Sequence, residues 1–145
     1  MAPRYKATVT MVRGNPLTLK DYQALAGIRS GMRQFLEFSA QAAQEAGLTP
    51  AQHQALLAIK GMTGPVTVGE LAIWLGVRHH SVVGMVNRLA ALKLVARVPD
   101  PKDRRRVHLK LTPHAETRLA ALSQIHRAEL RRFSAVLAPL LAALR

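Results

Sequence analysis

The chain has no cysteine among its 145 residues, and this absence removes several classes of protein. Disulfide scaffolds, thiol nucleophiles, cysteine-based zinc sites and thiol redox switches all need a side chain that the sequence does not contain. A metal would have to be held by histidines and carboxylates. The six histidines do not lie at spacings typical of metal ligands, so we expect no metal site.

Long apolar runs and acidic residues are also scarce. No uninterrupted apolar segment reaches the roughly 18 residues that a membrane helix needs, and residues 1–16 contain no apolar block like that of a signal peptide. We therefore expect a soluble, cytoplasmic protein with no membrane partner. Only 8 Asp and Glu stand against 21 Lys and Arg, and the formal net charge of +13 makes a polyanion the leading class of partner.

Enzymatic signatures are missing as well. The sequence has no paired carboxylates, no glycine-rich phosphate loop and no metal triad. Ser81 directly follows His80, but adjacent residues on a helix do not face each other, so the two make a poor nucleophile and base. We therefore predict that the protein is not an enzyme and uses no cofactor.

The positive charge that is present is unevenly distributed. Residues 1–20 carry four basic side chains and no acid, residues 21–64 are neutral overall, and residues 65–112 have a net charge of +6. A length of 145 residues suits a single hydrophobic core. We therefore expect one compact unit with a basic central block and a basic N-terminal arm.

The same signal for the start of a helix occurs three times, as a threonine followed three residues later by an acceptor side chain. These pairs are Thr18 and Asp21, Thr49 and Gln52, and Thr67 and Glu70. Apolar residues recur at steps of three and four after the first start and again after Thr112. The sequence predicts helices at about 19–46, from 50 to 61 or 64, at 68–75, and from 113 onward, with Pro139 breaking or kinking the last.

Residues 94–111 follow a different period. The stretches 94–98 and 107–111 alternate apolar and polar side chains, which is typical of strands, and the residues between them are rich in turn formers and arginine. We predict a β-hairpin with a protruding basic loop.

The preceding residues 68–89 fit a helix-turn-helix, with Ala72 at the helix crossing and Gly76 in the turn. The second helix would enter the major groove of DNA, where its exposed polar side chains can reach base edges or phosphates. These side chains are Arg78, His79, His80, Ser81, Asn87 and Arg88. No serine, threonine or aspartate precedes this helix, so we expect a phosphate to complete its N-terminus. A helix-turn-helix followed by a basic hairpin forms a winged helix.

Several short motifs carry a family resemblance: Leu71-Ala72, Leu75-Gly76-Val77, Val86-Asn87-Arg88-Leu89, Leu94-Val95, Asp100-Pro101-Lys102-Asp103-Arg104-Arg105 and Leu109-Lys110-Leu111-Thr112. Over roughly residues 19–140 the sequence resembles the MarR (multiple antibiotic resistance regulator) family of bacterial transcription factors. The resemblance implies a dimeric repressor whose terminal helices form the interface and whose recognition helices read an inverted repeat. It also implies a ligand pocket between the DNA-binding lobe and the dimer helices.

The resemblance assigns roles in the wing. Arg105 would enter the minor groove at the wing tip, and Asp103 would orient the wing through a salt bridge. The wing residues expected to contact DNA are Lys102, Arg104, Arg105 and Arg106. Asn87 stands where the family usually has aspartate. We therefore expect the contact between this position and the wing to be lost, or to be replaced by a direct contact of Asn87 with a base.

We therefore predict a mainly α-helical fold with a small β-hairpin wing and long terminal helices that form a dimerisation region. Residues 1–16 would be an irregular basic arm, 17–48 a dimerisation helix, 49–112 the winged helix-turn-helix lobe, and 113–145 C-terminal dimerisation helices. The predicted function is that of a sequence-specific, ligand-responsive repressor that binds an inverted-repeat operator on double-stranded DNA as a homodimer.

Two other classes of function are compatible with the same charge. A protein that packages nucleic acid or associates with RNA would need only the basic surface, and a winged helix can also bind a protein partner. The effector remains open, although the basic surplus favours a small anionic or aromatic molecule. The arm is either a solvated tail or a further DNA contact, and either His79 or His80 could contact DNA.

Overall fold

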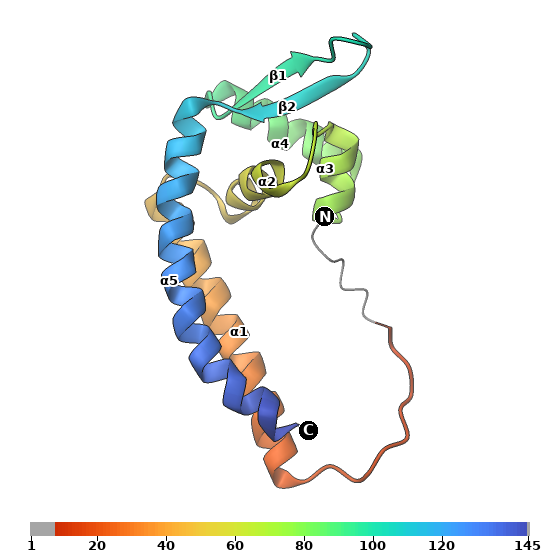
Figure 1. The fold of residues 1–145 in the computed structure, drawn as a ribbon, viewed down its shortest axis with the longest axis vertical. Helices are drawn as coiled ribbons and strands as arrows, with labels where there is room; N and C mark the ends of the chain where they lie inside the picture. The colour runs from red at the N-terminus through yellow and green to blue at the C-terminus, as the bar shows by residue number, and fades with distance from the viewer. Residues whose placement is uncertain (1–7, 145) are drawn as a thin grey trace.

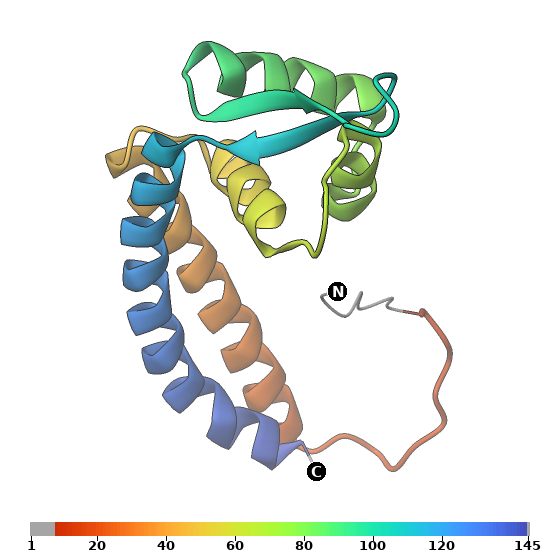
Figure 2. The same ribbon diagram turned by 45° about the horizontal axis from the view of Figure 1, so that its top comes forward.

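The computed structural model describes residues 8–144 as a pair of long helices with a small winged lobe at one end (Figure 1). Helices α1 (Leu19–Glu45) and α5 (Pro113–Ala143) run side by side in opposite directions in both views (Figures 1 and 2). The lobe consists of α2 (Pro50–Gly61), α3 (Val68–Leu75), α4 (His79–Ala91), β1 (Val95–Pro99) and β2 (Val107–Leu111). The predicted fold class, mainly helical with a hairpin wing, is confirmed.

The N-terminal arm is described only in part. Residues 8–17 form no helix or strand and run away from the two long helices (Figure 2). The expected role of residues 1–7 lies outside the described residues.

All three predicted helix starts are confirmed. The side chain of Thr18 accepts a hydrogen bond from the backbone N–H of Asp21 at 3.3 Å, and the Asp21 carboxylate accepts one from the backbone N–H of Thr18 at 2.7 Å. The same reciprocal pair of bonds starts α2 and α3. These bonds satisfy backbone donors that a helix start otherwise leaves unpaired, so the lobe helices begin where the sequence places them.

The turn between α3 and α4 depends on Gly76. Its φ of 68° lies in the left-handed region, which a residue with a Cβ adopts only with strain. The backbone N–H of Val77 closes the turn by donating to the Ala72 carbonyl at 3.1 Å. Ala72 is buried, as its expected position at the helix crossing requires.

The close approach of α1 and α5 depends on small residues in α1. A Cβ added at Gly31 would lie 2.7 Å from a ring carbon of Phe133, and one at Gly27 would lie 3.1 Å from Leu140. Phe133 also stacks on Phe35, with ring centroids 5.8 Å apart. The two glycines therefore let side chains of α5 fit against the backbone of α1.

The predicted break at Pro139 is wrong. Helix α5 continues through Pro139 to Ala143, so a single helix follows the wing. Proline removes only one backbone donor from the helix. The turn that contains it packs on α1 through Leu140, which lies against Gly27. This tertiary contact outweighs the local tendency of proline to end a helix.

The lobe and the long helices share one hydrophobic core. Its fully buried large side chains come from α2, α3, α4, the start of the hairpin and α5, and they are Leu56, Leu71, Val82, Val86, Leu89, Leu94 and Leu122. Ala43 of α1 is also completely buried in the same cluster. Helix α4 is therefore fixed to a packed support that reaches the long helices.

Candidate nucleic-acid interface

Helix α4 is buried on one face and exposed on the other. Val82, Val86 and Leu89 are fully buried against the rest of the lobe. The six residues predicted from the sequence to contact DNA are all exposed: Arg78, His79, His80, Ser81, Asn87 and Arg88. No acidic residue lies on α4. This face can therefore approach phosphates without charge repulsion from its own helix.

The N-terminus of α4 has no side-chain cap, as the sequence predicts. Arg78 occupies the capping position and its side chain makes no capping bond. The other four described helices all begin with a threonine whose side chain accepts a backbone N–H. The first turn of the exposed helix thus keeps donors that an anion can bind.

Asn87 joins α4 to the wing by a hydrogen bond. The guanidinium Nη2 of Arg97, on β1, donates a hydrogen bond to Oδ1 of Asn87. The expectation that Asn87 has lost its wing partner is therefore wrong, whereas a contact of Asn87 with a base stays a prediction. The sequence contained one signal for this contact, which sequence reasoning did not use. Arg97 is the single arginine within the strand that follows α4.

This contact gives a first prediction. The Asn87→Ala variant should lose affinity for all duplexes by a similar factor, about three- to tenfold, because it frees the wing rather than removing a base contact. Asn87→Asp should keep the affinity, because a carboxylate accepts from Arg97 at least as well as an amide oxygen. Fluorescence anisotropy on a panel of duplexes measures both. A change confined to one base position would instead assign Asn87 to base reading.

Asp100 organises the loop of the wing. Its carboxylate accepts backbone hydrogen bonds from Lys102 at 2.7 Å and Asp103 at 3.2 Å, and it pairs with Nε2 of the buried His108 at 3.2 Å. The bond from the backbone of Lys102 is the largest cause that lowers the pKa of Asp100. The Asp103 N–H, His108 and Arg106 lower it further. The loop is therefore held in one shape before it meets a ligand.

Asp103 acts differently from the role implied by the family resemblance. Its carboxylate accepts the backbone N–H of Arg105 at 3.0 Å, and it forms no ion pair with any described residue. The expected salt bridge of Asp103 is therefore not formed. The Asp103 carboxylate turns to the loop backbone, and it is Asp100 that reaches a side chain of the strand, with 3.2 Å between its Oδ2 and Nε2 of His108.

The four basic residues predicted to contact DNA from the wing divide into two groups. Lys102, Arg104 and Arg105 are exposed, and their side chains pair with no acid in the described part of the chain. Arg106 is also exposed, but its Nη2 lies 4.0 Å from Oε1 of Glu70 in the first turn of α3. The first group can project toward a ligand, whereas Arg106 also helps to hold the wing to the lobe.

A buried histidine pair joins the lobe to the long helices. His53 of α2 lies with its ring 4.7 Å from the ring of His126 in α5, measured between centroids. Nδ1 of His126 is 2.8 Å from the Leu122 carbonyl, and Nε2 is 2.7 Å from Oγ of Ser39. Among the described residues no three His, Asp or Glu side chains come close enough to hold a metal ion. Sequence reasoning missed this pair because its members lie on different helices.

The pair predicts a pH dependence of stability. Burial, and then the proximity of His126, lower the pKa of His53 below its usual 6.5. The unfolded chain therefore binds a proton more readily, and the free energy of unfolding should fall as the pH drops below about 6.5. Urea titrations between pH 7.5 and 5.5 measure it. The His53→Leu variant should show a flatter profile and the exposed-site variant His114→Gln should not. Equal slopes in all three proteins would contradict this account.

No helix within residues 8–144 combines the length and the apolar character needed to cross a membrane.

The sequence model of the MarR family matches residues 46–106, which extend from the end of α1 to the tip of the wing.

One curated relative is an uncharacterized HTH-type transcriptional regulator, YcgE of Bacillus subtilis. It is 43% identical over 70 residues, which cover 48% of this chain and 45% of that protein, so the match spans less than half of the relative. Among solved structures, the transcriptional regulator Tm0710 of Thermotoga maritima is 28% identical with a TM-score of 0.62, over 79% of this chain and 78% of that chain.

A mutant of Staphylococcus aureus MepR bound to an oligodeoxyribonucleotide has a TM-score of 0.69 and 20% identity, over 86% of this chain and 98% of that chain. At this identity the likeness concerns the fold alone. Both YcgE and Tm0710 are named as transcriptional regulators.

Proposed function

We propose that the chain, whose residues 46–106 match the sequence model of the MarR family, is a transcriptional regulator of that family and binds double-stranded DNA with sequence preference. One observation carries the proposal. Helix α4 and the basic wing lie next to each other at the end of the lobe (Figures 1 and 2), and the hydrogen bond from Arg97 to Asn87 links them.

The dimensions of these elements suit DNA. The 13-residue α4 is a single α-helix, which the roughly 12 Å wide major groove of B-DNA admits. The narrow minor groove beside it attracts arginine, and Arg105 lies on the exposed loop that would reach it. Contacts in two adjacent grooves would fix both the register and the sequence preference of the lobe.

The long helices support a homodimer as the binding unit. They leave large apolar side chains exposed, which are Leu25, Met32 and Leu36 on one face of α1 and Ile125, Leu130, Val136 and Leu141 on α5. A second copy of the chain that packs on the long helices would cover part of this apolar surface and place two lobes side by side. A symmetric dimer reads two half-sites in opposite orientation, so the operator would be an inverted repeat.

The proposal includes regulation by a small molecule. The hydrophobic core is continuous from the lobe to the long helices. A shift in the packing between the lobe and the long helices would therefore alter the distance between the α4 helices of the two chains in the dimer. A ligand that changes this distance would release the protein from its operator, which is how a repressor responds to an effector.

Selection from random duplexes with the full chain tests the function. The selected duplex should contain an inverted repeat and bind with about 10³- to 10⁷-fold preference over unrelated DNA at one salt concentration. Affinity should also fall steeply with salt, because basic side chains displace counterions. Strong binding without preference would indicate a nucleic-acid-packaging protein. Absence of salt-dependent binding to any duplex would indicate a module that binds protein.

A further inference from the structure

Gly84 lies near the middle of α4, where a glycine makes a helix less stable. Two glycines of α1 have a reason in the fold, because a Cβ at Gly31 or Gly27 would lie 2.7 Å or 3.1 Å from side chains of α5. Gly84 has no such reason. A Cβ there would meet Nη1 of Arg88 at 3.5 Å, which is an ordinary contact, and the φ of Gly84 is not positive. The single chain would therefore accept alanine at this position.

The helical repeat places Gly84 on the outermost line of α4. At about 3.6 residues per turn, it points roughly 140° to 160° away from each of the three side chains that α4 buries in the lobe. His80 and Arg88 lie one turn before and one turn after Gly84 on this line, and both are exposed. Between them the backbone of α4 is the part of the helix that a partner would meet.

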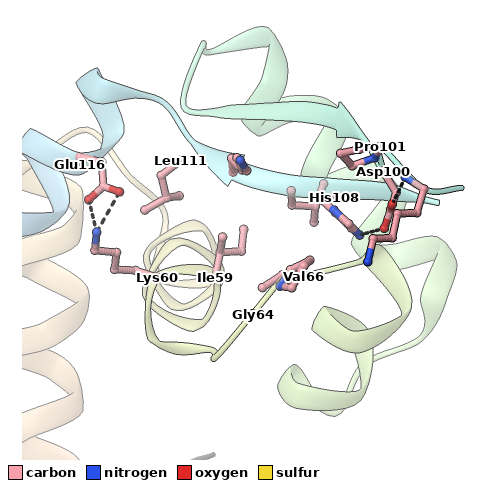
Figure 3. Close-up of a pocket in the computed structure, with 13 residues that line it drawn as sticks. Ile59, Lys60, Gly64, Val66, Asp100, Pro101, His108, Leu111 and Glu116 are labelled. Atoms are coloured by element: carbon pink, nitrogen blue, oxygen red, sulfur yellow. Dashed lines mark hydrogen bonds and ion pairs between the residues drawn. The ribbon is translucent and has the colours of Figure 1, made fainter. Parts of the chain in front are cut away.

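The pocket of the lobe lies elsewhere. It is beneath strand β2, and its walls come from the end of α2, the loop at residues 64–66, the wing and the first turn of α5 (Figure 3). No residue of α4 lines it. Because Gly84 stands on the outer surface of a helix, a partner must fit around the helix to reach it. The major groove of B-DNA, about 12 Å wide, has this shape.

Arg88 carries the donors that lie nearest to Gly84. Its Nη1 is 3.5 Å from the Cβ position of Gly84, so the side chain extends back along α4. Its guanidinium pairs with no acid in the described part of the chain, and α4 itself contains no acidic residue. Arginine commonly reads guanine, because two of its N–H groups match the O6 and N7 acceptors. A free guanidinium beside a gap in the helix surface suits a guanine that comes close to the backbone.

We propose that Gly84 sets the depth at which α4 enters the major groove and that Arg88 reads a guanine at this point of closest approach. The inference rests on the proposed binding of double-stranded DNA. Without a side chain at Gly84, the edge of one base pair in each half-site lies against the backbone of α4. The Cβ of an alanine would hold that base pair away and move its O6 and N7 atoms out of hydrogen-bond reach of Arg88. Gly84 is therefore a positioning residue, and Arg88 makes the contact.

The Gly84→Ala variant should bind DNA more weakly although its fold is more stable. Alanine favours a helix more than glycine does, so the melting temperature should rise by about 2–4 °C. Affinity for the operator selected with the natural chain should fall at least about tenfold, because an arginine–guanine contact is weakened in each half-site. A merely structural role of Gly84 cannot produce both changes, since a damaged fold melts at a lower temperature.

Base preference identifies the pair that lies against Gly84. Each base pair of the half-site is replaced in turn, and the duplexes are titrated with the natural chain, Gly84→Ala and Arg88→Gln. The natural chain should prefer guanine at one position, and both variants should lose most of that preference at the same position. Gly61→Ala is the matched control, because a Cβ at this exposed end of α2 would meet nothing within 4 Å in the described chain. It should leave the operator affinity unchanged.

The outcomes separate this inference from the proposed function. If the natural chain selects no duplex, the proposed function fails, and the reading of a base at Gly84 fails with it. If the natural chain prefers its operator but Gly84→Ala binds it as tightly, only the close approach at Gly84 is overturned. The same conclusion follows if Gly84→Ala and Arg88→Gln lose preference at different base pairs. A lower melting temperature of Gly84→Ala would also overturn the inference, because the fold itself would then need the glycine.

Discussion

The Arg105→Ala variant should bind the selected operator at least about 30-fold more weakly than the natural chain, while its dimerisation is unchanged. Arg105 is exposed at the wing tip, and its side chain pairs with no described acid, so it can extend fully into a groove. A specific arginine contact is worth about 1–3 kcal/mol, and a dimer loses two of them. The backbone of Arg105 is held by Asp103, so the loop should keep its shape in the variant.

A matched control separates a local contact from the loss of net charge. Arg127→Ala removes the same charge from the exposed surface of α5 and should change operator affinity by less than about twofold. Anisotropy at one salt concentration compares the three proteins, and light scattering checks the dimer. If Arg105→Ala binds the operator as tightly as the natural chain, the wing does not enter the minor groove.

Arg106→Ala should behave differently from Arg105→Ala, because Arg106 also reaches Glu70 on α3. Loss of that contact loosens the wing, and Glu70→Gln should reproduce this part of the effect without removing a positive charge. The four basic wing residues are alike in sequence, and only their partners in the folded chain distinguish their roles.

The helix boundaries were predictable because they depend on neighbours in the sequence. Each capping box is formed within four residues, and the turn at Gly76 needs only the freedom of a glycine backbone. The exposure of the polar face of α4 followed from the helical repeat for the same reason. The predicted resemblance to the MarR family agrees with the match of its sequence model to residues 46–106.

The pairings across the lobe were not predictable from the sequence. Arg97 reaches Asn87 only because the hairpin returns along α4, and His108 reaches Asp100 through the register that pairs Pro99 with Val107. The side chain of Asp103 could turn outward to an arginine or inward to the backbone, and the loop geometry selects the second. Pro139 shows the same dependence, since its helix persists through contact with α1.

The Leu36→Glu variant should dimerise at least about 100-fold more weakly than the natural chain. Leu36 is 60% exposed in the single chain, on a groove of α1 that also includes Leu25, Ile28 and Met32. Burial of a leucine is worth about 1.5–3 kcal/mol, and an unpaired carboxylate in the same place costs more. By symmetry each dimer carries the substitution twice. Sedimentation at micromolar concentration should therefore give 15.9 kDa in place of about twice that mass.

The loss of the dimer should in turn abolish tight operator binding, because one lobe alone holds only one half-site. Gln23→Glu adds the same charge at an exposed position of α1 outside that groove and should leave both the mass and the operator affinity unchanged. Circular dichroism separates dissociation from unfolding, since Leu36 contributes little to the core of the single chain. A Leu36→Glu protein that remains folded and dimeric would place the interface elsewhere, and the inverted-repeat operator would then lack its structural basis.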